Sequence, residues 1–406
     1  MYFYEDNELH IGSKERSHPV SSFVKSYEGP VYIYDLNDIH TRFNAYDRAF
    51  AGLHHTIHYA MKANSNPILL KKLASWGAGV DTVSAGEIRK ALEAGFKPEK
   101  IIFSGVAKTR KEIEFAVENK IKQINIESPA ELARVIEVAR AKHQITNVAF
   151  RLNPDVNPQT HPYITTGFRE NKFGMDESFL PELIKQLKGA TDAVKLRGLT
   201  MHIGSLLFDL DVLVEAMEKT LAVHHLLTKE GFELDRFDVG GGLGIRYETQ
   251  DATEELNMLA AYGERLKQVV QKHLPAKTEI LAEPGRILVA RSGLLISEVQ
   301  YIKRAPAKTF AIVDTGMHHL LRPALYQAKH RVLPLKSATN RHSYDVVGPI
   351  CESSDVLAKN VELPELKAGD LLAMADAGAY GFSMASQYNS HDLPREIVVE
   401  NGAVQS

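Results

Sequence analysis

Short β-type runs alternate with amphipathic helical segments from about residue 56 to residue 285, and this alternation constrains the fold more than any other feature. Eight such runs occur, at residues 57–61, 80–83, 101–103, 123–126, 148–152, 198–203, 237–239 and 279–282. Runs of this length with helix-period segments between them indicate repeated βα units. Eight units in roughly 230 residues is the period of a (β/α)8 barrel. A doubly wound open sheet has the same alternation and is the alternative.

Polar residues follow the expected strands at their C-terminal ends, and this favours the barrel. These residues are Lys62, Ser84, Ser104, Glu127, Ser128, Arg151, Asn153, His202, Ser205, Gly240, Gly241, Gly242 and Glu283. In a (β/α)8 barrel the C-terminal strand ends converge on one face, where active sites are built. One polar strand end means little, because every strand must end. Polar residues after all eight strands predict a polar site at the barrel mouth.

The pattern changes after Pro284. Four β-type segments, at residues 292–305, 308–316, 341–350 and 369–380, follow one another without regular helices between them. This predicts a mainly antiparallel β-domain. A further β-type segment, at residues 30–34, precedes the barrel. The sequence therefore predicts an α/β chain with a barrel at residues 36–283 and a β-domain formed by residues 1–35 and 284–406.

Composition excludes several classes of protein. The chain has 406 residues, 44% hydrophobic and 24% charged, which is typical of a soluble globular protein. Its net charge of −3 argues against a nucleic-acid or membrane-surface protein. No run approaches the roughly 20 apolar residues of a membrane span, and the polar start is unlike a signal peptide, so we expect a cytoplasmic protein. The single cysteine, Cys351, excludes intrachain disulfides and cysteine clusters, and without an HExxH motif we expect no metal site.

Lys62 directly follows the first barrel strand, where a charge is costly to desolvate. The simplest interpretation is a lysine whose stem packs on the strand while its ammonium reaches water. Its place at the barrel mouth and its polar neighbours Asn64, Ser65 and Asn66 favour a chemical role. A lysine in a partly desolvated pocket loses proton affinity and becomes a nucleophilic amine suited to a Schiff base.

The run Gly240, Gly241 and Gly242 follows the seventh strand and offers backbone N–H groups to an anion without obstruction by a Cβ atom. Phosphate sites in such barrels are often built from the loops after strands seven and eight. A glycine-rich loop alone could equally be a tight turn. The loop after the eighth strand adds a carboxylate and a guanidinium, from Glu283 and Arg286, with Gly285 between them, and Ser205 could add a hydroxyl.

Together these groups suggest pyridoxal phosphate as the cofactor. That cofactor needs a lysine for its aldehyde, donors for its phosphate and a charged partner for its pyridine nitrogen. Glu283 would keep the pyridine nitrogen protonated, and His202 would lie against the face of the ring.

Eight motifs carry a resemblance to a known family. They are YAMKANSN (59–66), TTGFRENKFGM (165–175), HIGS (202–205), DVGGGLG (238–244), EPGR (283–286), LRPALY (321–326), GPICESSD (348–355) and GAYGFSMASQYN (378–389). In this order they resemble the alanine-racemase-like-barrel decarboxylases, and most closely the bacterial diaminopimelate decarboxylase family. EPGR and HIGS are shared by several decarboxylases of the fold, whereas LRPALY with CESSD is much more specific. The resemblance covers nearly the whole chain.

The resemblance implies a role for each matching residue. Lys62 resembles the lysine that holds the cofactor, and His202 the histidine that stacks on its ring. Gly242 and the loop from Glu283 to Arg286 resemble the cofactor-binding segment. The remaining roles are substrate binding by Arg286, Arg322 and Tyr326, proton donation by Cys351, binding of the distal amino group by Glu352, and contact with cofactor and substrate by Tyr380. In this family Cys351 and Glu352 reach the site of a neighbouring subunit, which implies an obligate homodimer with two shared sites.

The implied reaction is decarboxylation of meso-2,6-diaminoheptanedioate to L-lysine and carbon dioxide, the last step of lysine biosynthesis. A second carboxylate on the substrate calls for a guanidinium, which Arg322 and Arg286 supply, and a thiol of tunable pKa can deliver a proton. Ornithine-type relatives lack the arginine of LRPALY and have aspartate after the cysteine, so Arg322 and Glu352 favour diaminopimelate. The family usually has glutamine where this chain has Leu206, which is interpreted as a changed local contact.

Three other functions stay open. The same scaffold could decarboxylate D-ornithine, D-lysine or a carrier-bound amino acid, and Leu206 is the one hint in that direction. An amino-acid racemase would need a catalytic tyrosine on the β-domain as its second base. Cys351, within the CESSD motif, fits that requirement poorly. A non-catalytic cofactor carrier of this type is a single barrel, so the residues after the barrel argue against it.

Overall fold

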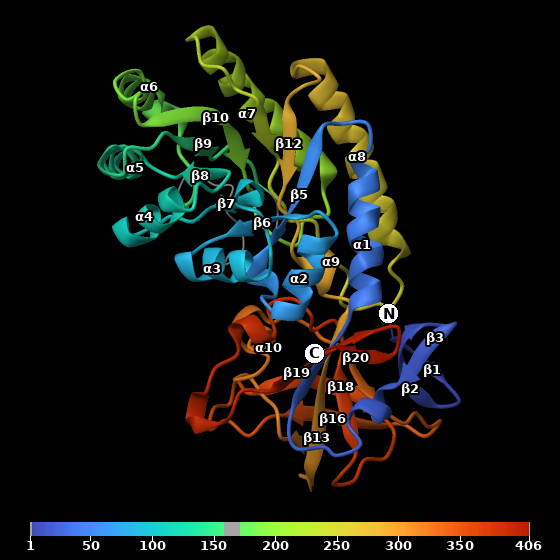
Figure 1. Cartoon of the computed structure of the whole chain (residues 1–406). Helices are drawn as coiled ribbons and strands as arrows, with labels where there is room; N and C mark the ends of the chain where they lie inside the picture. The colour runs from blue at the N-terminus through green and yellow to red at the C-terminus, as the bar shows by residue number, and fades with distance from the viewer. Residues whose placement is uncertain (1, 158–170, 406) are drawn as a thin grey trace. The chain divides into compact units, whose positions relative to one another are not determined.

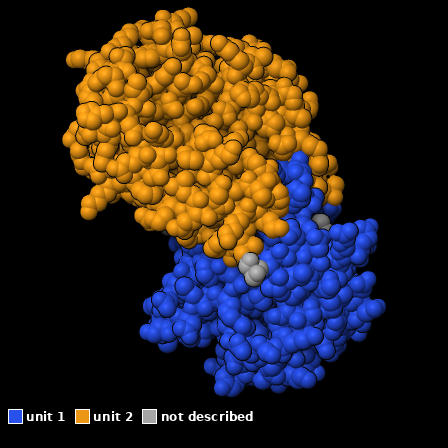
Figure 2. All heavy atoms as spheres, in the orientation of Figure 1, with its two compact units in different colours: residues 1–44, 245–252, 286–406 blue, residues 45–244, 253–285 orange. Residues whose placement is uncertain are grey.

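The computed structural model describes residues 2–157 and 171–405. The chain divides into two compact units, which Figure 2 shows in different colours. Unit 1 comprises Met1–Asn44, Ile245–Ala252 and Arg286–Ser406, and unit 2 comprises Ala45–Gly244 and Thr253–Gly285. The helix α1 (Leu36–Ala49) is therefore shared, and the segment 245–252 leaves the barrel region to join unit 1. Of the motifs named above, residues 165–170 lie outside the described residues.

Unit 2 contains a closed barrel of eight parallel strands, which confirms the (β/α)8 prediction and excludes the open sheet. The strands are β5 (His55–Ala60), β6 (Gly79–Thr82), β7 (Ile101–Phe103), β8 (Gln123–Ile126), β9 (Thr146–Leu152), β10 (Val194–Met201), β11 (Arg236–Asp238) and β12 (Glu279–Ala282). The barrel closes where β12 pairs with β5, with Ile280 opposite His55. Closure makes the end of the last strand a neighbour of the end of the first.

Helices surround the strands of the barrel (Figure 1). They are α2 (Pro67–Ser75), α3 (Ala85–Glu93), α4 (Arg110–Glu118), α5 (Pro129–Ala141), α6 (Leu180–Lys188), α7 (Leu210–Lys229) and α8 (Thr253–His273). Side chains just before the first turn cap several of them. The hydroxyls of Ser84 and Ser128 accept from Glu87 N and Glu131 N. Thr109 and Glu112 form a reciprocal capping box on α4.

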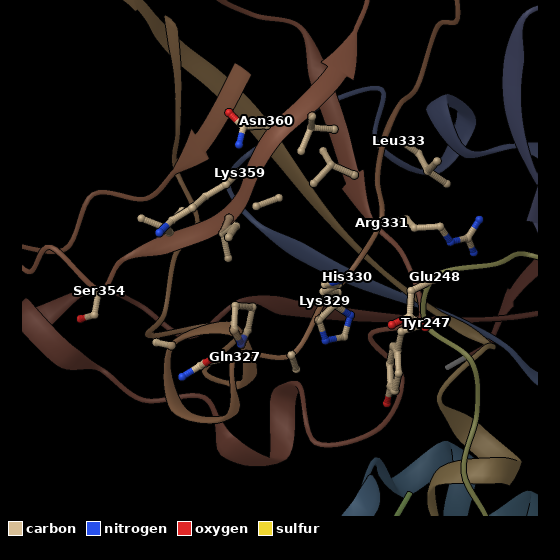
Figure 3. A pocket seen from close by; sticks show the side chains of 18 of the residues that line it. Tyr247, Glu248, Gln327, Lys329, His330, Arg331, Leu333, Ser354, Lys359 and Asn360 are labelled. Carbon is tan, nitrogen blue, oxygen red and sulfur yellow. The ribbon is translucent and has the colours of Figure 1, made fainter. Parts of the chain in front are cut away.

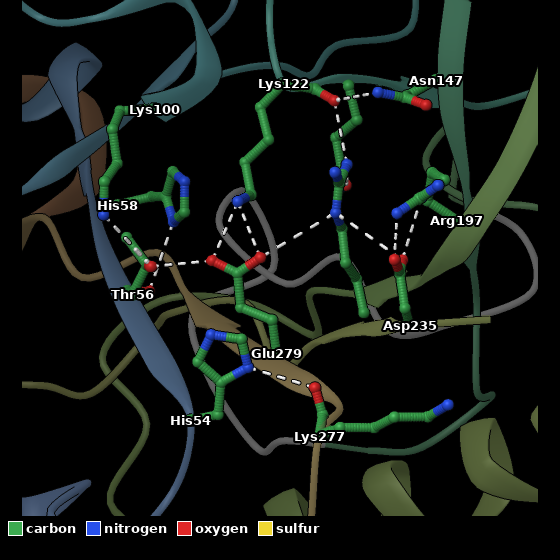
Figure 4. A network of polar contacts seen from close by, with 12 residues as sticks. His54, Thr56, His58, Lys100, Lys122, Asn147, Arg197, Asp235, Lys277 and Glu279 are labelled. Atoms are coloured by element: carbon green, nitrogen blue, oxygen red, sulfur yellow. Dashed lines mark hydrogen bonds and ion pairs between the residues drawn. The ribbon is translucent and has the colours of Figure 1, made fainter.

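The opposite, N-terminal end of the barrel holds a network of charges around Glu279 (Figure 4). Lys122 Nζ lies 2.8 and 2.7 Å from the two Glu279 oxygens, and Thr56 Oγ1 donates to Glu279 at 2.8 Å. The pair is largely buried. Burial alone would raise the pKa of Glu279, but the lysine ammonium and the threonine hydroxyl lower it to about 2. Since Thr56, Lys122 and Glu279 belong to β5, the turn before β8 and β12, the network joins separated strands.

Unit 1 is built on a nine-stranded sheet with the order β17-β16-β14-β13-β4-β19-β20, to which β18 and β15 add at β13. Its strands are β4 (Val31–Asp35), β13 (Gly293–Arg304), β14 (Thr309–Val313), β15 (Val332–Pro334), β16 (His342–Val347), β17 (Val356–Leu363), β18 (Leu371–Met374), β19 (Arg395–Glu400) and β20 (Ala403–Gln405). The pairs β4–β19 and β14–β16 are parallel and the others antiparallel. The predicted mainly antiparallel β-domain is thus confirmed, with two parallel pairs that the sequence did not indicate.

The sheet of unit 1 joins the two ends of the chain. The early strand β4 lies between β13 and β19, and Tyr34 is opposite Gly293. Buried apolar residues from β4, β13 and β18 form one core with the small sheet of β1 (Tyr2–Glu5), β2 (Glu8–Ser13) and β3 (Arg16–Pro19). Two short helices complete the unit, α9 (Arg286–Val289) and α10 (Arg322–Tyr326). Among the described residues, no helix has the length and apolarity needed to span a membrane.

Candidate active site

Lys62 lies two residues beyond β5, in a short 3-10 turn (Met61–Ala63) at the mouth of the barrel. Its Nζ atom is 3.2 Å from Asp81 Oδ2, at the end of the neighbouring strand β6. The Asp81 side chain is fully buried, whereas that of Lys62 is 38% exposed. After the turn Asn66 caps α2, its side chain accepting from Ile68 N. The ammonium is therefore paired with a buried carboxylate, while the lysine side chain stays partly exposed at the mouth of the barrel.

A pair of buried carboxyl groups lies at the ends of the last two strands, Asp238 on β11 and Glu283 directly after β12. Burial, followed by the Asp238 and Asp81 charges, raises the pKa of Glu283 well above its usual value. Burial also raises the pKa of Asp238 to about 7. Because two adjacent buried carboxyls do not ionise together, the pair retains a proton near neutral pH.

One oxygen on each of these acids lacks a hydrogen-bond partner among the described residues. These atoms are Glu283 Oε1 and Asp238 Oδ2, and Asp81 Oδ1 shares the property. Asp238 Oδ1, by contrast, accepts from Gly240 N at 2.9 Å. A buried carboxyl oxygen without a donor costs free energy, on the order of 1–3 kcal/mol. The proton that the pair retains lies between Asp238 and Glu283 and hydrogen-bonds them to each other, so a cationic N–H group of a ligand beside Glu283 would take the place of that proton.

The glycine loop after β11 has a backbone path that only glycine fits. Gly240 and Gly242 have φ angles of 66° and 116°, in the left-handed region. A Cβ atom on Gly241 would collide with the carbonyl oxygen of Glu283, and one on Gly242 with that of Gly204. Backbone hydrogen bonds tie the loop to its surroundings, with Glu283 N donating to Gly240 O at 2.7 Å. The loop and Glu283 therefore hold each other in place.

His202 follows β10 and is oriented by the glycine loop, since Gly241 N donates to its Nδ1 atom at 3.3 Å. That contact leaves the ring hydrogen on Nε2 if the ring is neutral. Burial, together with the Lys62 and Arg151 charges, lowers the pKa of His202 well below its usual value. The imidazole is thus neutral. Ser205 lies three residues further on and is half-buried.

Two buried arginines, Arg286 and Arg322, form a cluster with tyrosines in unit 1. Arg286, which opens α9, donates to Tyr247 Oη at 2.8 Å, and its guanidinium lies 4.7 Å from the centre of the Tyr380 ring. Arg322, which opens α10, lies 4.5 Å from the centre of the Tyr247 ring. Tyr326, the last residue of α10, contributes to the electrostatic environment of both arginines. The cluster is rich in positive charge and in aromatic surface.

Cys351 and Glu352 lie together on an exposed turn of unit 1. Glu352 accepts from Tyr388 Oη at 2.6 Å and from Ser354 Oγ at 3.0 Å, and these bonds lower its pKa. Cys351 N points at Asn389 Oδ1, 3.4 Å away. A polar pair on an exposed turn is available to a second molecule, whereas the two arginines lie inside unit 1.

Buried Asp355 fixes the base of this turn. Its two carboxylate oxygens accept from Met317 N at 2.6 Å and from Ile350 N at 2.7 Å. The glycines Gly316 and Gly348 leave room for the carboxylate, because a Cβ atom on either would meet its oxygens.

The structure therefore places the residues expected at the barrel mouth around one end of unit 2, and the expected arginines and tyrosines in one cluster of unit 1. Four residues that contact this machinery were not predicted from the sequence, namely Asp81, Asp238, Tyr247 and His330. Asp81 and Asp238 were visible as acids inside apolar strand runs, which is a usable signal of a functional carboxylate. Tyr247 and His330 had no signal, because their roles depend on tertiary contacts with the arginines.

Comparisons with known proteins agree with this fold. The family "Pyridoxal-dependent decarboxylase, pyridoxal binding domain" matches residues 36–290. The diaminopimelate decarboxylase of Aquifex aeolicus is 40% identical over 405 residues, covering 99% of this chain and 93% of the relative. A crystal structure of diaminopimelate decarboxylase from Helicobacter pylori complexed with L-lysine is 40% identical, with a TM-score of 0.88 and 95% of each chain covered. A diaminopimelate decarboxylase from M. jannaschii, also in complex with L-lysine, is 33% identical with a TM-score of 0.90, covering 99% of this chain and 93% of the other.

Proposed function

Because this chain belongs to the diaminopimelate decarboxylase family of pyridoxal-dependent decarboxylases, we propose that it converts meso-2,6-diaminoheptanedioate to L-lysine and carbon dioxide, using the residues described above. The observation that carries the residue assignment is the pairing of β12 with β5. It sets the Lys62 amine and the buried Glu283 carboxyl on adjacent strand ends. Pyridoxal phosphate requires an amine for its aldehyde and, nearby, a carboxyl that accepts a hydrogen bond from its pyridine nitrogen.

The residues of unit 2 fit the three polar groups of pyridoxal phosphate. Lys62 would hold its aldehyde, Gly242 N–H and the Ser205 hydroxyl would donate to its phosphate, and Glu283 would accept from its pyridine nitrogen. Gly240 and Gly241 would shape the loop, because their N–H groups already donate to Asp238 Oδ1 and His202 Nδ1. Gly285 lets the eighth loop pack closely against Ala60 and Ala63, on either side of the Lys62 turn. A cationic nitrogen beside Glu283 would favour the ionised carboxylate and reverse the rise of its pKa. Neutral His202, held by Gly241, provides an uncharged surface for the ring. When bound, the cofactor supplies an electron sink for the bond that releases carbon dioxide.

The residues of unit 1 bind and protonate the substrate in this proposal. Arg322 and Arg286 bind the carboxylate that is not lost, through planar paired hydrogen bonds. Tyr326 and Tyr380 contact the substrate beside them, and the Glu352 carboxylate binds the distal ammonium. The Cys351 thiol delivers a proton to the carbon that has lost its carboxylate.

We infer in addition that two copies of the chain share their active sites. Cys351 and Glu352 are exposed on their turn, whereas Arg322 is buried within unit 1, which supports a turn that serves the site of a second subunit. The proposed assembly is a homodimer in which each subunit completes the site of the other. The proposed compartment is the cytoplasm, which suits an unpaired Cys351.

The test is carbon dioxide release from meso-diaminopimelate, with L,L-diaminopimelate, D-lysine, D-ornithine and L-arginine as parallel substrates. Turnover of the meso compound alone supports the assignment of Arg322 and Glu352 to the two polar groups at the distal end. Turnover of D-lysine or D-ornithine instead would keep Lys62 and Cys351 in their roles and overturn the assignment of the distal pocket. If added pyridoxal phosphate produces no absorbance of a lysine-bound cofactor, the whole proposal is wrong.

A further inference from the structure

We propose that His330 is a positioning residue that holds the Arg322 guanidinium for the carboxylate of the substrate, as a neutral imidazole that leaves the charge of the arginine intact. The inference rests on the proposed function of Arg322. It adds an explanation of how this arginine selects ligands that carry a carboxylate over ligands that lack one. His330 lies on the loop between α10 and β15 and is buried.

The two neighbours of the ring fix its tautomer. His330 Nδ1 is 2.8 Å from Ala375 O, a carbonyl oxygen that can only accept, so Nδ1 carries the hydrogen. His330 Nε2 is 2.7 Å from a terminal nitrogen of Arg322, which can only donate, so Nε2 is an acceptor. Protonation would turn Nε2 into a donor that faces a guanidinium. Burial and the Arg322 charge accordingly lower the pKa of His330 to about 3.

Arg322 has an unusual environment for a buried cation. Its side chain is among the largest fully buried ones, and the groups that most affect its pKa, besides burial, are Tyr247, Arg286, Tyr380 and Tyr326. None of these is a carboxylate, and one is a second guanidinium. Within residues 2–157 and 171–405, no carboxylate forms an ion pair with Arg322. Buried cations are normally paired, so the cluster is suited to an anion that comes with the ligand.

His330 orients the Arg322 guanidinium through a hydrogen bond and leaves its positive charge unneutralised. An acidic residue at position 330 would also hold Arg322, but its charge would compete with a carboxylate ligand. The imidazole occupies one terminal nitrogen only. The Nε atom of Arg322 is buried and has no hydrogen-bond partner among the described residues, so it remains a donor for the ligand. The geometry thus divides the guanidinium into an anchored edge and a binding edge.

Tyr247 supports the same arrangement from the side. Its ring packs edge-on against His330, with ring centres 5.1 Å apart and planes at 68°, and it faces Arg322 while its hydroxyl accepts from Arg286. Figure 3 shows His330 and Tyr247 next to each other in the wall of a cavity of about 920 Å³ in unit 1. A small replacement at position 330 would connect this cavity to Arg322 and admit water, so the test requires replacements of similar size.

The test uses the holoenzyme and two ligands that differ by one carboxylate, L-lysine and cadaverine. His330→Leu keeps the volume but offers Arg322 no acceptor. His330→Gln supplies an amide oxygen that can replace Nε2. Binding is followed as the change in cofactor absorbance, together with kcat and KM for meso-diaminopimelate.

We expect His330→Leu to weaken L-lysine binding by about tenfold or more, equivalent to about 1.4 kcal/mol, and to change cadaverine binding by less than about twofold. KM for the meso substrate should rise more than kcat falls, and His330→Gln should restore most of the loss. Equal weakening of both ligands, or L-lysine binding as tight as in the unaltered enzyme, would overturn the role of His330.

A second pair of variants covers the case in which His330→Leu does not retain the cofactor. His330→Asn can still donate to Ala375 O but is too short to reach Arg322, so His330→Gln should bind L-lysine more tightly than His330→Asn. Equal binding by these two would also reject the inference. Failure of the proposed function would be seen separately, as absence of turnover of meso-diaminopimelate by the unaltered enzyme.

Discussion

Glu283 shows how much of the proposed chemistry depends on the surroundings of one side chain. Its carboxyl is buried near two other acids, Asp238 and Asp81, and one of its oxygens has no hydrogen-bond partner among the described residues. In water the same residue would be an ordinary carboxylate. Burial makes it an acid whose charge depends on what binds beside it.

Replacement of this carboxyl by an amide tests that dependence. Glu283→Gln should retain the cofactor through Lys62 but lower kcat by about 10²-fold or more, because an amide cannot hold the pyridine nitrogen in its protonated form. The measurement is single-turnover kinetics with the absorbance spectrum of the bound cofactor. The exposed Glu177→Gln serves as the control. An unchanged kcat would remove Glu283 from the chemistry.

Cys351 gives a second prediction for a single residue. Cys351→Ala should bind the cofactor normally, since the thiol is exposed on its turn, and should lower kcat by about 10²- to 10⁴-fold through loss of a proton donor. Cofactor absorbance and carbon dioxide release, measured on the same sample, separate the two effects. Turnover at the original rate would exclude the thiol from the mechanism.

Among structural elements, the glycine loop after β11 is the most sterically restricted part of the proposed site. The carbonyl oxygen of Glu283 occupies the position that a Cβ atom on Gly241 would need. Gly241→Ala should therefore displace the loop and weaken pyridoxal phosphate binding by about tenfold or more, as measured by titration of the apoenzyme. Gly86→Ala is the matched control, because its nearest neighbour, Ser84 Oγ, would lie 3.5 Å away. Equal cofactor affinity in both variants would contradict this account.

Much of the element structure could be predicted because it depends on local signals. Three strands, at 101–103, 123–126 and 279–282, begin and end where the sequence pattern indicates, and the caps at Ser84 and Ser128 are visible as residue types. The parallel pairs β4–β19 and β14–β16 could not be predicted, since they join segments far apart in the chain. The partners of Arg322 were missed for a different reason, because which side chains meet depends on tertiary packing. His330 is only eight residues away, but nothing in its local sequence shows that the ring points at the guanidinium.

At the scale of the whole barrel, the network around Glu279 links stability to pH. The pKa of Glu279 is lowered from its usual 4.5 to about 2, so the folded state favours the ionised form. Its contribution is fully present above about pH 4.5 and is lost as the pH falls toward 2. Glu279→Gln should lower the free energy of unfolding at pH 7 by about 2–3 kcal/mol, partly because Lys122 loses its partner.

Urea unfolding of both proteins at pH 7 and pH 3.5 is the measurement. The difference between them should shrink at the lower pH, because Glu279 is then partly protonated in the unfolded chain. The matched control is Glu182→Gln on α6, an acid on the exposed face of a helix. A difference that stays constant or grows as the pH falls would contradict the sign of the shift.

Sharing of sites between subunits can be tested at the scale of the assembly. Lys62→Ala and Cys351→Ala should each be inactive, and mixing them after dissociation should restore activity. In a random mixture half of the dimers are mixed, and each of these has one intact site, so about a quarter of the original activity should return. Each variant subjected alone to the same treatment is the control. No recovery, with mixed dimers demonstrated, would show that Lys62 and Cys351 of the same chain act together.

The place of β4 has a consequence for how this protein is made. The strand is made before the barrel, but one of its two sheet neighbours, β13, follows roughly 260 residues later, and the other, β19, roughly 360 residues later. At about 5–20 residues per second, an apolar strand waits on the order of 10–50 s with both edges unsatisfied. During that interval the barrel strands emerge in order and can pair with neighbours already present. Nascent chains of this protein are therefore expected to carry a finished barrel beside an aggregation-prone N-terminal segment, and to need holdase chaperones most at that stage.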